Sequence, residues 1–271
     1  MNFLLARCGH TDPESLTDYM GAGGFVALDK ARQIGPRGVV DELVASGLVG
    51  RGGAAFPCGR KWASVAAIQA PAKYVICNAD ESEPGTFKDR KLMEEDPFAV
   101  LEAMLIAGLA VGGTRGYIYI RGEYALAARR LQGALDQLRR AGYLGHDFDV
   151  ELRRGGGAYI CGEETALMNS IEGRRGEPRS KPPFPTERGL FAAPTLLNNV
   201  ETLVNVPLIV ERGSEWYKSI GTPGLTGPKL FCLSGHVKRR GVYEVPGGMP
   251  LRELLEEHGG GVAGRSFQAV L

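Results

Sequence analysis

The sequence predicts an α/β fold with a mostly parallel sheet, followed by a small β-rich region. Short apolar segments alternate with helical ones between residues 73 and 171, as expected for parallel strands joined by crossover helices. Polar or glycine-rich runs at 78–85 and 155–164 follow two of the strands, and open parallel sheets bind ligands at that end of their strands. From residue 228 onward the pattern changes to short strands separated by turns.

The individual elements follow from apolar periodicity and from helix start and stop signals. Segment 97–110 is almost entirely apolar, so we expect a buried helix there. Near the N-terminus, 12–48 has a helical and connective character, with a short amphipathic helix at 39–46 that Gly47 ends. The remaining expected strands are 73–77, 116–121 and 148–152, and the remaining expected helices are 123–141, one ending at residue 171 and one starting at residue 199.

Two segments are expected to lack regular structure. Segment 47–62 is dense in glycine, and 173–200 contains five prolines with little periodicity. Long loops inside compact domains are usually functional. These boundaries divide the chain into a helical and connective segment (1–46), an α/β domain (47–227) and a second domain (228–271).

The second domain should contain strands within 229–237 and 241–246 and a helix at 250–258. It ends on a strand-like FQAVL at 267–271, so we expect the chain to be a fragment that stops inside this domain.

Composition excludes several classes of protein. Lys and Arg number 32 against 31 Asp and Glu, so no field of one sign would attract nucleic acid or an anionic membrane. The five cysteines are dispersed, which is typical of reduced thiols and gives no local zinc or iron–sulfur motif. The longest apolar stretch, 103–111, is far shorter than the ~20 residues of a membrane span. We therefore expect a cytoplasmic protein without membrane insertion.

The glycine-rich segment nearly matches two phosphate-binding motifs. Residues 50–55 satisfy GxGxxA, but a helix precedes them where a Rossmann motif needs a strand. Segment 53–61 resembles a Walker loop with one residue too many, and Trp62 stands at the position of the magnesium ligand. Arg51, Lys61 and Phe56 would supply cations and a ring to a nucleotide. A nucleotide-binding loop, a kinase-like ATP site and a flexible loop therefore remain as alternatives.

The polar runs also allow more than one interpretation. Asp80, Glu81 and Glu83 could bind a metal, accept hydrogen bonds from a ribose or a nicotinamide amide, or form a solvated turn. The acids of Gly162-Glu163-Glu164-Thr165 and the pair Asn198-Asn199 could serve a ligand or merely cap helices.

Five motifs taken together resemble one known family. In order, they are GLVGRGGAAFPCGRKW, CNADESEPGTFKDR, GAYICGEETALMNSIEG, KPPFP and LNNVETL. They resemble the NADH-oxidising, flavin-carrying subunit of respiratory complex I (NADH-quinone oxidoreductase) and the diaphorase subunits of NAD-linked hydrogenases and formate dehydrogenases. The resemblance covers residues 2 to 271. It implies a Rossmann-like domain that binds FMN and NADH, followed by the start of a ubiquitin-like SLBB domain.

The resemblance also assigns site residues. Those expected to line the flavin and its phosphate are Arg51, Gly52, Lys61, Asn78, Asp80 and Glu81, with Gly162, Glu163, Asn198, Asn199 and Thr202 on the other side. Those expected to meet the dinucleotide are Gly53, Phe56, Glu83, Tyr159, Glu164, Lys181 and Phe184. Phe56 and Phe184 can stack on adenine, and Glu164 would repel the 2′-phosphate of NADPH.

The implied reaction is hydride transfer from NADH to FMN, followed by single-electron transfer to iron–sulfur clusters. The cofactor carries this chemistry, so no residue is expected to act as a catalytic acid or base. Implied partners are a thioredoxin-like 2Fe-2S subunit and a further iron–sulfur subunit, within a complex that can be peripheral to the membrane. The family's 4Fe-4S ligands are absent from this sequence, so a non-catalytic docking module is the alternative.

Three positions depart from the family pattern. Ala55 stands where another Gly is typical, and Cys58 where Thr is usual. Ser64 stands where an aromatic residue often adds a wall to the adenine pocket.

Overall fold

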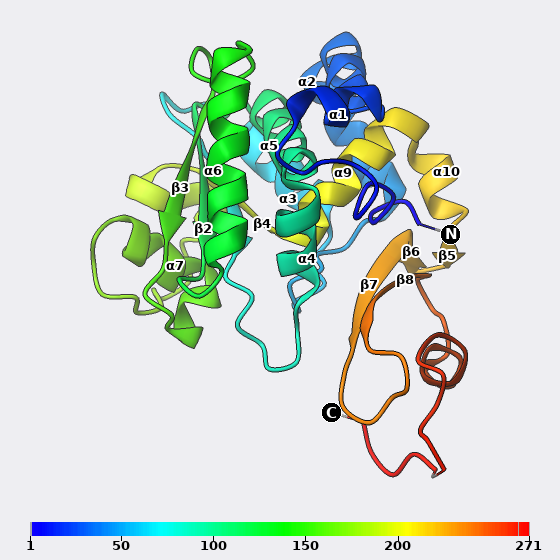
Figure 1. Ribbon diagram of the computed structural model, residues 1–271. Coiled ribbons are helices and arrows are strands. Elements are labelled where there is room, and N and C mark those ends of the chain that lie inside the picture. The colour runs from blue at the N-terminus through cyan, green and yellow to red at the C-terminus, as the bar shows by residue number, and fades with distance from the viewer. Residues whose placement is uncertain (1, 265, 271) are drawn as a thin grey trace.

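A four-stranded parallel sheet organises the chain (Figure 1) in a computed structural model that describes residues 2–264 and 266–270. The strand order is β3-β2-β1-β4, and every neighbouring pair is parallel. The strands are β1 (Tyr74–Ala79), β2 (Arg115–Ile120), β3 (Asp149–Arg154) and β4 (Thr195–Asn199). This arrangement confirms the predicted parallel α/β fold.

Helices cover both faces of the sheet because side chains alternate along each strand. Val75 and Cys77 of β1 face the larger core, while Ile76 faces a smaller core that includes Leu167 and Met168. The helices contributing to the larger core are α2 (Val26–Ser46), α3 (Cys58–Ala67), α4 (Lys88–Glu95), α5 (Pro97–Val111), α6 (Ala125–Arg140) and α9 (Val200–Arg212). On the opposite face lie α7 (Glu164–Ile171) and the short turns η1 (Tyr159–Gly162) and η2 (Leu190–Ala192).

The order of the strands locates a ligand crevice. The chain runs outward from β1 to β2 and β3, then returns to place β4 on the other side of β1. In open α/β sheets, the crevice at such a reversal of strand order is the preferred binding position. Asn78 near the end of β1 pairs in register with Asn199 at the end of β4, so two amide side chains stand at this crevice.

Two predictions of irregular structure were wrong in part. Segment 47–62 contains the start of α3, because Pro57 ends the glycine-rich loop and can precede a helix as its N-cap residue. Segment 173–200 contains β4 and the short α8 (Pro185–Arg188). The strand was missed because the proline-rich surroundings hid the short apolar run Thr195-Leu196-Leu197, which β1 pairs as an edge strand.

Three further expectations need correction. The helix predicted at 39–46 is the end of the longer α2, which is kinked at Gly35, where φ is +72°. The helix predicted at 250–258 is divided between α11 (Leu251–Glu253) and a π-helical turn, η3 (Leu254–His258). The strand-like 267–271 has no strand over 267–270, and Leu271 lies outside the described residues.

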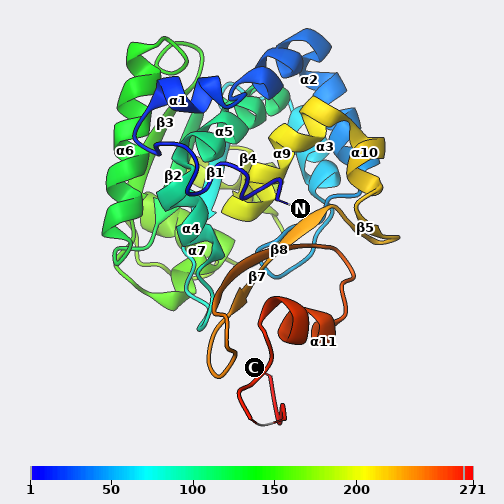
Figure 2. The ribbon, with the colours of Figure 1, turned by 45° about the vertical axis from the view of Figure 1, so that its right-hand side comes forward.

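The C-terminal region is an antiparallel hairpin with its own small core, and Figures 1 and 2 show it extending below the α/β body. Three contacts fasten it to that body. Glu201 accepts the backbone N–H of Leu230 at 2.9 Å, Cys232 accepts that of Phe87 at 3.2 Å, and Glu244 accepts those of Phe3 and Leu5. The elements here and before the hairpin are α1 (Leu16–Gly21), α10 (Ser214–Lys218), β5 (Gly221–Thr222), β6 (Leu225–Thr226), β7 (Pro228–Leu233) and β8 (Gly241–Pro246).

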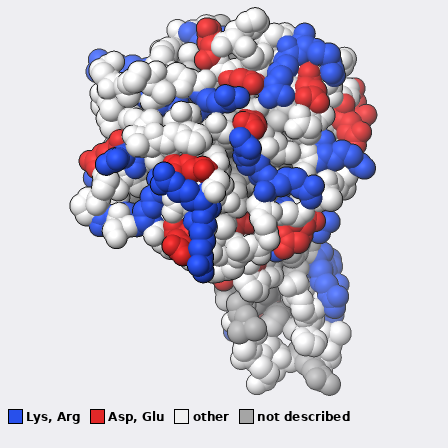
Figure 3. Space-filling model, turned by 90° about the vertical axis from the view of Figure 1, so that its left-hand side faces the viewer, with Lys and Arg blue, Asp and Glu red and all other residues white. Residues whose placement is uncertain are grey.

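The surface carries charges of both signs. On the face in Figure 3, Lys and Arg are interspersed with Asp and Glu over the α/β body. Among the described residues, no helix combines the length and the apolar character needed to cross a bilayer.

Candidate functional site

Two adjoining cavities lie at the carboxyl ends of β1 and β4. The first has a volume of about 560 Å³ and the second about 530 Å³. Both are lined by Gly52, Asn78, Gly162, Glu163 and Asn199. Because they share these residues, the cavities form one continuous site at the reversal of strand order.

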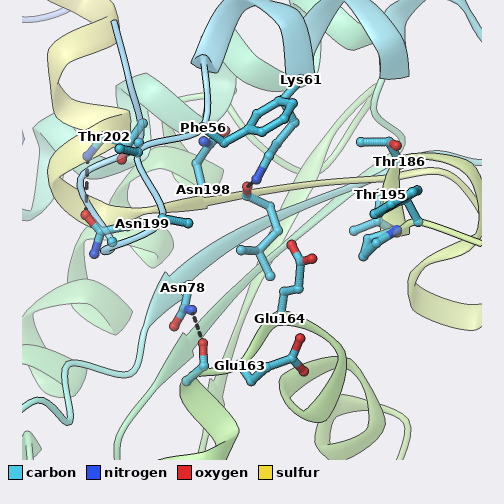
Figure 4. Close-up of a pocket in the computed structure, with 18 of the residues that line it drawn as sticks. Phe56, Lys61, Asn78, Glu163, Glu164, Thr186, Thr195, Asn198, Asn199 and Thr202 are labelled. Carbon is cyan, nitrogen blue, oxygen red and sulfur yellow. Dashed lines mark hydrogen bonds between the residues drawn. The ribbon is translucent and has the colours of Figure 1, made fainter. Parts of the chain in front are cut away.

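The first cavity combines rings, cations and backbone (Figure 4). Phe56 and Phe184 line it and are each about half exposed, at 48% and 53%. The ammonium of Lys61 lies 5.9 Å from the centre of the Phe56 ring and donates to the carbonyl of Leu197 at 3.1 Å. Two exposed rings beside a cation are suited to a planar base attached to phosphates.

The second cavity is predominantly acidic. Its lining includes the five carboxylates of Asp80, Glu81, Glu83, Asp89 and Glu163, against the two cations Arg51 and Lys88. An excess of carboxylates disfavours an anionic group and suits an uncharged ring that can donate hydrogen bonds. The two cavities therefore differ in the ligand part that each would accept.

The structure brings all eighteen predicted site residues to these two cavities. They come from five separate segments of the chain, and the most distant of them, Arg51 and Thr202, are 151 positions apart. Those of the first cavity are Gly52, Phe56, Lys61, Asn78, Gly162, Glu163, Glu164, Lys181, Phe184, Asn198, Asn199 and Thr202. Those found in the second cavity alone are Arg51, Gly53, Asp80, Glu81, Glu83 and Tyr159.

The glycine-rich loop is closed on itself and fixed to α9. The N–H of Gly50 donates to the carbonyl of Phe56 at 2.9 Å, and that of Arg51 donates to Thr202 Oγ1 at 2.8 Å. A Cβ on Gly52 would lie 3.1 Å from Cβ of Asn199, so a side chain there would crowd the crevice. Ala55 adopts φ +50°, in the left-handed region, which gives a physical reason why glycine suits this position.

Arg51 is committed to the start of the C-terminal region. Its guanidinium donates to the carbonyls of Thr226 at 2.9 Å and Pro228 at 3.3 Å. The side chain is buried, so it holds the glycine-rich loop against the connection to the hairpin. Arg51 therefore has a structural contact in addition to its place in the second cavity.

The acidic run after β1 contains three carboxylates in three different environments. Glu81 accepts the N–H groups of Asp89 and Arg90 at 2.9 and 3.0 Å, so it caps the first turn of α4. Glu83 accepts the hydroxyl of Tyr159 at 2.8 Å. Oδ2 of Asp80 is buried without a hydrogen-bond partner, and desolvation raises the pKa of this carboxyl. An orphaned acceptor of this kind is suited to a ligand that donates a hydrogen bond.

Helix capping explains part of the other polar runs. Glu163 accepts the N–H groups of Thr165 and Ala166 at the start of α7. Although desolvation raises its pKa, the bonds to Thr165, Ala166 and Lys181 together lower it. Asn199 caps α9 through Thr202 and donates to Asp89 at 2.6 Å.

The capped helices still present their N-termini to the site. α9 has 13 residues, and its capping residue Asn199 lines both cavities. The positive end of the helix dipole there favours a phosphate. Lys181 pairs with both Glu163 and Glu164, which raises the pKa of the lysine despite the opposing effect of desolvation.

Several lining residues escaped prediction. In the second cavity, Lys88 and Asp89 lie within the quoted motif CNADESEPGTFKDR, but the helix that carries them was not predicted. In the first cavity, Thr186, Thr195 and Leu197 come from the segment that was expected to be a loop. Recognition of α4 and β4 would have located all five. Ser64 also lines the first cavity, where its hydroxyl donates to the carbonyl of Arg60.

Comparisons with known families and structures agree with this geometry. Residues 43–208 match the family described as "Nuo51 FMN-binding domain", and residues 230–270 match the SLBB domain. A solved structure described as an NAD+-reducing [NiFe]-hydrogenase in the air-oxidized state superposes with a TM-score of 0.84 at 37% identity. That match covers 97% of this chain and 43% of the other.

Curated relatives give the same result. The F 2 subunit of the NADH-quinone oxidoreductase of Rhizobium meliloti (strain 1021) is 49% identical over 99% of this chain and 66% of its own length. The HndC subunit of the NADP-reducing hydrogenase of Solidesulfovibrio fructosivorans is 49% identical over 97% of this chain and 55% of its own length. The chain thus spans between about half and two thirds of these relatives. The resemblance noted in the sequence is confirmed, and the chain belongs to the Nuo51 FMN-binding domain family.

Proposed function

We propose that this chain is the FMN- and NADH-binding part of an NADH dehydrogenase. The observation that carries the proposal is the convergence of eighteen residues from five separate segments on two adjoining cavities at the reversal of strand order. Family membership adds FMN as the resident cofactor. The relatives named as oxidoreductase and hydrogenase subunits add NADH as the substrate.

The residues present suit FMN. Lys61 and the N-terminus of α9 provide positive charge for the phosphate, next to Asn199 and Thr202. Gly52 leaves its backbone open to a flat ring, and the orphaned Oδ2 of Asp80 can accept a hydrogen bond from a ring N–H. The residues proposed to hold FMN are Arg51, Gly52, Lys61, Asn78, Asp80, Glu81, Gly162, Glu163, Asn198, Asn199 and Thr202.

NADH would extend across both cavities. Its adenosine would occupy the first cavity, between Phe56 and Phe184, with Lys181 near the phosphates and Glu164 near the ribose. Its nicotinamide would reach the second cavity, where Glu83 can accept a hydrogen bond from the carboxamide beside Tyr159 and Gly53. This placement matches the charge of each cavity to the part of NADH that it would meet.

Bound FMN would accept a hydride from NADH, releasing NAD+, and then deliver the two electrons one at a time to an iron–sulfur centre. The protein's contribution is orientation and exclusion of water, since the chemistry needs no protein acid or base. We further propose the division at residues 46 and 227, a 2Fe-2S subunit and a further iron–sulfur subunit as partners, and a cytoplasmic location.

The proposal is tested by adding FMN to the purified chain and titrating it anaerobically with NADH while following flavin absorbance. Bleaching at about one NADH per FMN is the expected result for a two-electron site. Retained flavin that NADH does not bleach would favour the docking-module alternative. Failure to retain FMN in a demonstrably folded chain would contradict the proposal.

A further inference from the structure

The segment that carries Phe184 and Lys181 has few strands or helices to hold it. It runs from residue 179 to 191 and contains only the four-residue α8 and the turn η2. Pro185 and Thr186 of the same segment also line the first cavity. The position of one entire cavity wall therefore depends on the contacts made at the two ends of this segment.

Arg179 makes those contacts at the first end. Its Nε donates to Oδ1 of Asn169 on α7 at 2.8 Å, and its Nη1 donates to the carbonyl of Gly189 at 2.9 Å. Its Nη2 lies 2.9 Å from a carboxylate oxygen of Glu172. One guanidinium thus joins α7 to both ends of the segment, using the fork geometry that lysine lacks.

Glu172 secures the second end. The same oxygen that meets Arg179 accepts the N–H of Phe191 at 2.7 Å. The carboxylate side chain is only 7% exposed, and the guanidinium is 27% exposed. A nearly buried ion pair with directed hydrogen bonds fixes geometry more firmly than a surface pair does.

The anchor also connects to the capping residue of α7. The backbone N–H of Arg179 donates to Oγ1 of Thr165 at 2.8 Å, and that hydroxyl donates to Glu163. Glu163 in turn pairs with Lys181. The segment is therefore tied to α7 immediately before its first cavity-lining residue.

We propose that Arg179 and Glu172 are positioning residues that hold segment 179–191 against α7 and thereby place Phe184 and Lys181 in the wall of the first cavity. Neither residue lines the cavities. The link to NADH rests on the proposed function, whereas the anchoring of the segment does not depend on it.

The test compares Arg179→Gln and Glu172→Gln with the control Arg175→Gln in the full chain loaded with FMN. The control removes the same charge as Arg179→Gln, and the pair that Arg175 forms with Glu177 is exposed, at 87% and 63%. Anchoring is measured as the rate of tryptic cleavage after Arg188, and binding as the Kd of ADP-ribose by calorimetry. FMN content, kcat and KM for NADH complete the set.

We expect both variants to be cleaved after Arg188 about tenfold faster and to bind ADP-ribose about tenfold more weakly, because the wall is no longer pre-organised. KM for NADH should rise in parallel, with FMN content and kcat unchanged. The double variant should be no worse than either single variant, since both remove one interaction. Arg175→Gln should match the parent chain.

Unchanged cleavage and Kd in both variants would overturn the proposal, as would a joint loss of FMN and ADP-ribose binding. If Arg179→Gln fails to fold, Glu172→Gln decides, because it keeps the shape of its side chain. A parent chain that binds no ADP-ribose would contradict the proposed function. The cleavage assay would then still decide whether the segment is anchored by this pair.

Discussion

The two cavities are built in different ways. In the first, the rings of Phe56 and Phe184 stand half exposed, and neither ring supports a helix or a strand pairing. In the second, Glu81 caps α4 and Arg51 binds the connection to the hairpin, so lining residues also maintain the fold. Substitutions in the first cavity should therefore change ligand binding alone, whereas substitutions in the second should change stability as well.

The largest expected effect is that of Phe184→Ala. Loss of one stacking ring costs about 1–3 kcal/mol, so KM for NADH should rise between about fivefold and about a hundredfold. FMN content and the free energy of unfolding should stay unchanged, as the comparison of the cavities requires. Steady-state kinetics and urea denaturation measure the two quantities.

Phe191→Ala is the matched control for Phe184→Ala. Phe191 is also half exposed, but it lies outside both cavities and packs against the ring of Tyr74, with centroids 5.6 Å apart. Its KM should equal that of the parent chain. An equal rise in KM for both variants would remove the stacking argument.

Glu164→Gln should have the next largest effect. Loss of its charge should raise kcat/KM for NADPH relative to NADH about tenfold, because a 2′-phosphate would no longer meet a carboxylate. The ion pair with Lys181 already offsets part of that charge, which limits the expected gain. Glu177→Gln, at an exposed position, is the control, and an unchanged NADPH to NADH ratio would contradict the role of Glu164.

Asp80→Asn tests the second cavity through stability. Desolvation raises the pKa of Asp80 in the folded chain. Such a group stabilises the fold below its unfolded pKa and loses this contribution as the pH rises through its folded pKa. At pH 7 the variant without FMN should therefore be more stable than the parent, by up to about 1 kcal/mol.

The difference between Asp80→Asn and the parent should shrink as the pH falls below about 4, where both side chains are neutral. Urea denaturation at several pH values measures it. The exposed Asp147→Asn should show no such dependence. A less stable Asp80→Asn at pH 7 would show that the carboxylate is satisfied in the absence of ligand.

The smallest expected effect is that of Ala55→Gly. Relief of the left-handed backbone at φ +50° outweighs the extra entropy of the unfolded chain, for a net gain of about 0.5 kcal/mol. Ala54→Gly has no positive φ to relieve and should lose stability by a similar amount. Equal effects of the two substitutions would contradict the strain argument.

Much of the fold could be predicted from the sequence because its periodic elements are long and apolar. The buried α5 and the strand β1 follow directly from composition and flanking turns. The strand β4 could not be predicted, since five residues beside prolines carry no periodic signal and only pairing with β1 makes them a strand.

The site residues were predicted by resemblance, whereas their partners were not. Nothing local in the sequence shows that Asn199 donates to Asp89, 110 positions away, or that Arg51 reaches Thr226. Such contacts depend on how distant segments pack in three dimensions. They are also what separates a lining residue that is free to bind from one that is already engaged.

The position of β4 has a consequence for biosynthesis. Until residues 195–199 leave the ribosome, β1 is an unpaired edge strand, although every element of the glycine-rich loop and the acidic run has already been made. Asn198, Asn199 and Thr202 arrive together with that strand or just after it. Cofactor capture is therefore a late event in synthesis, and nascent chains halted before this point would expose an unpaired sheet edge that invites aggregation.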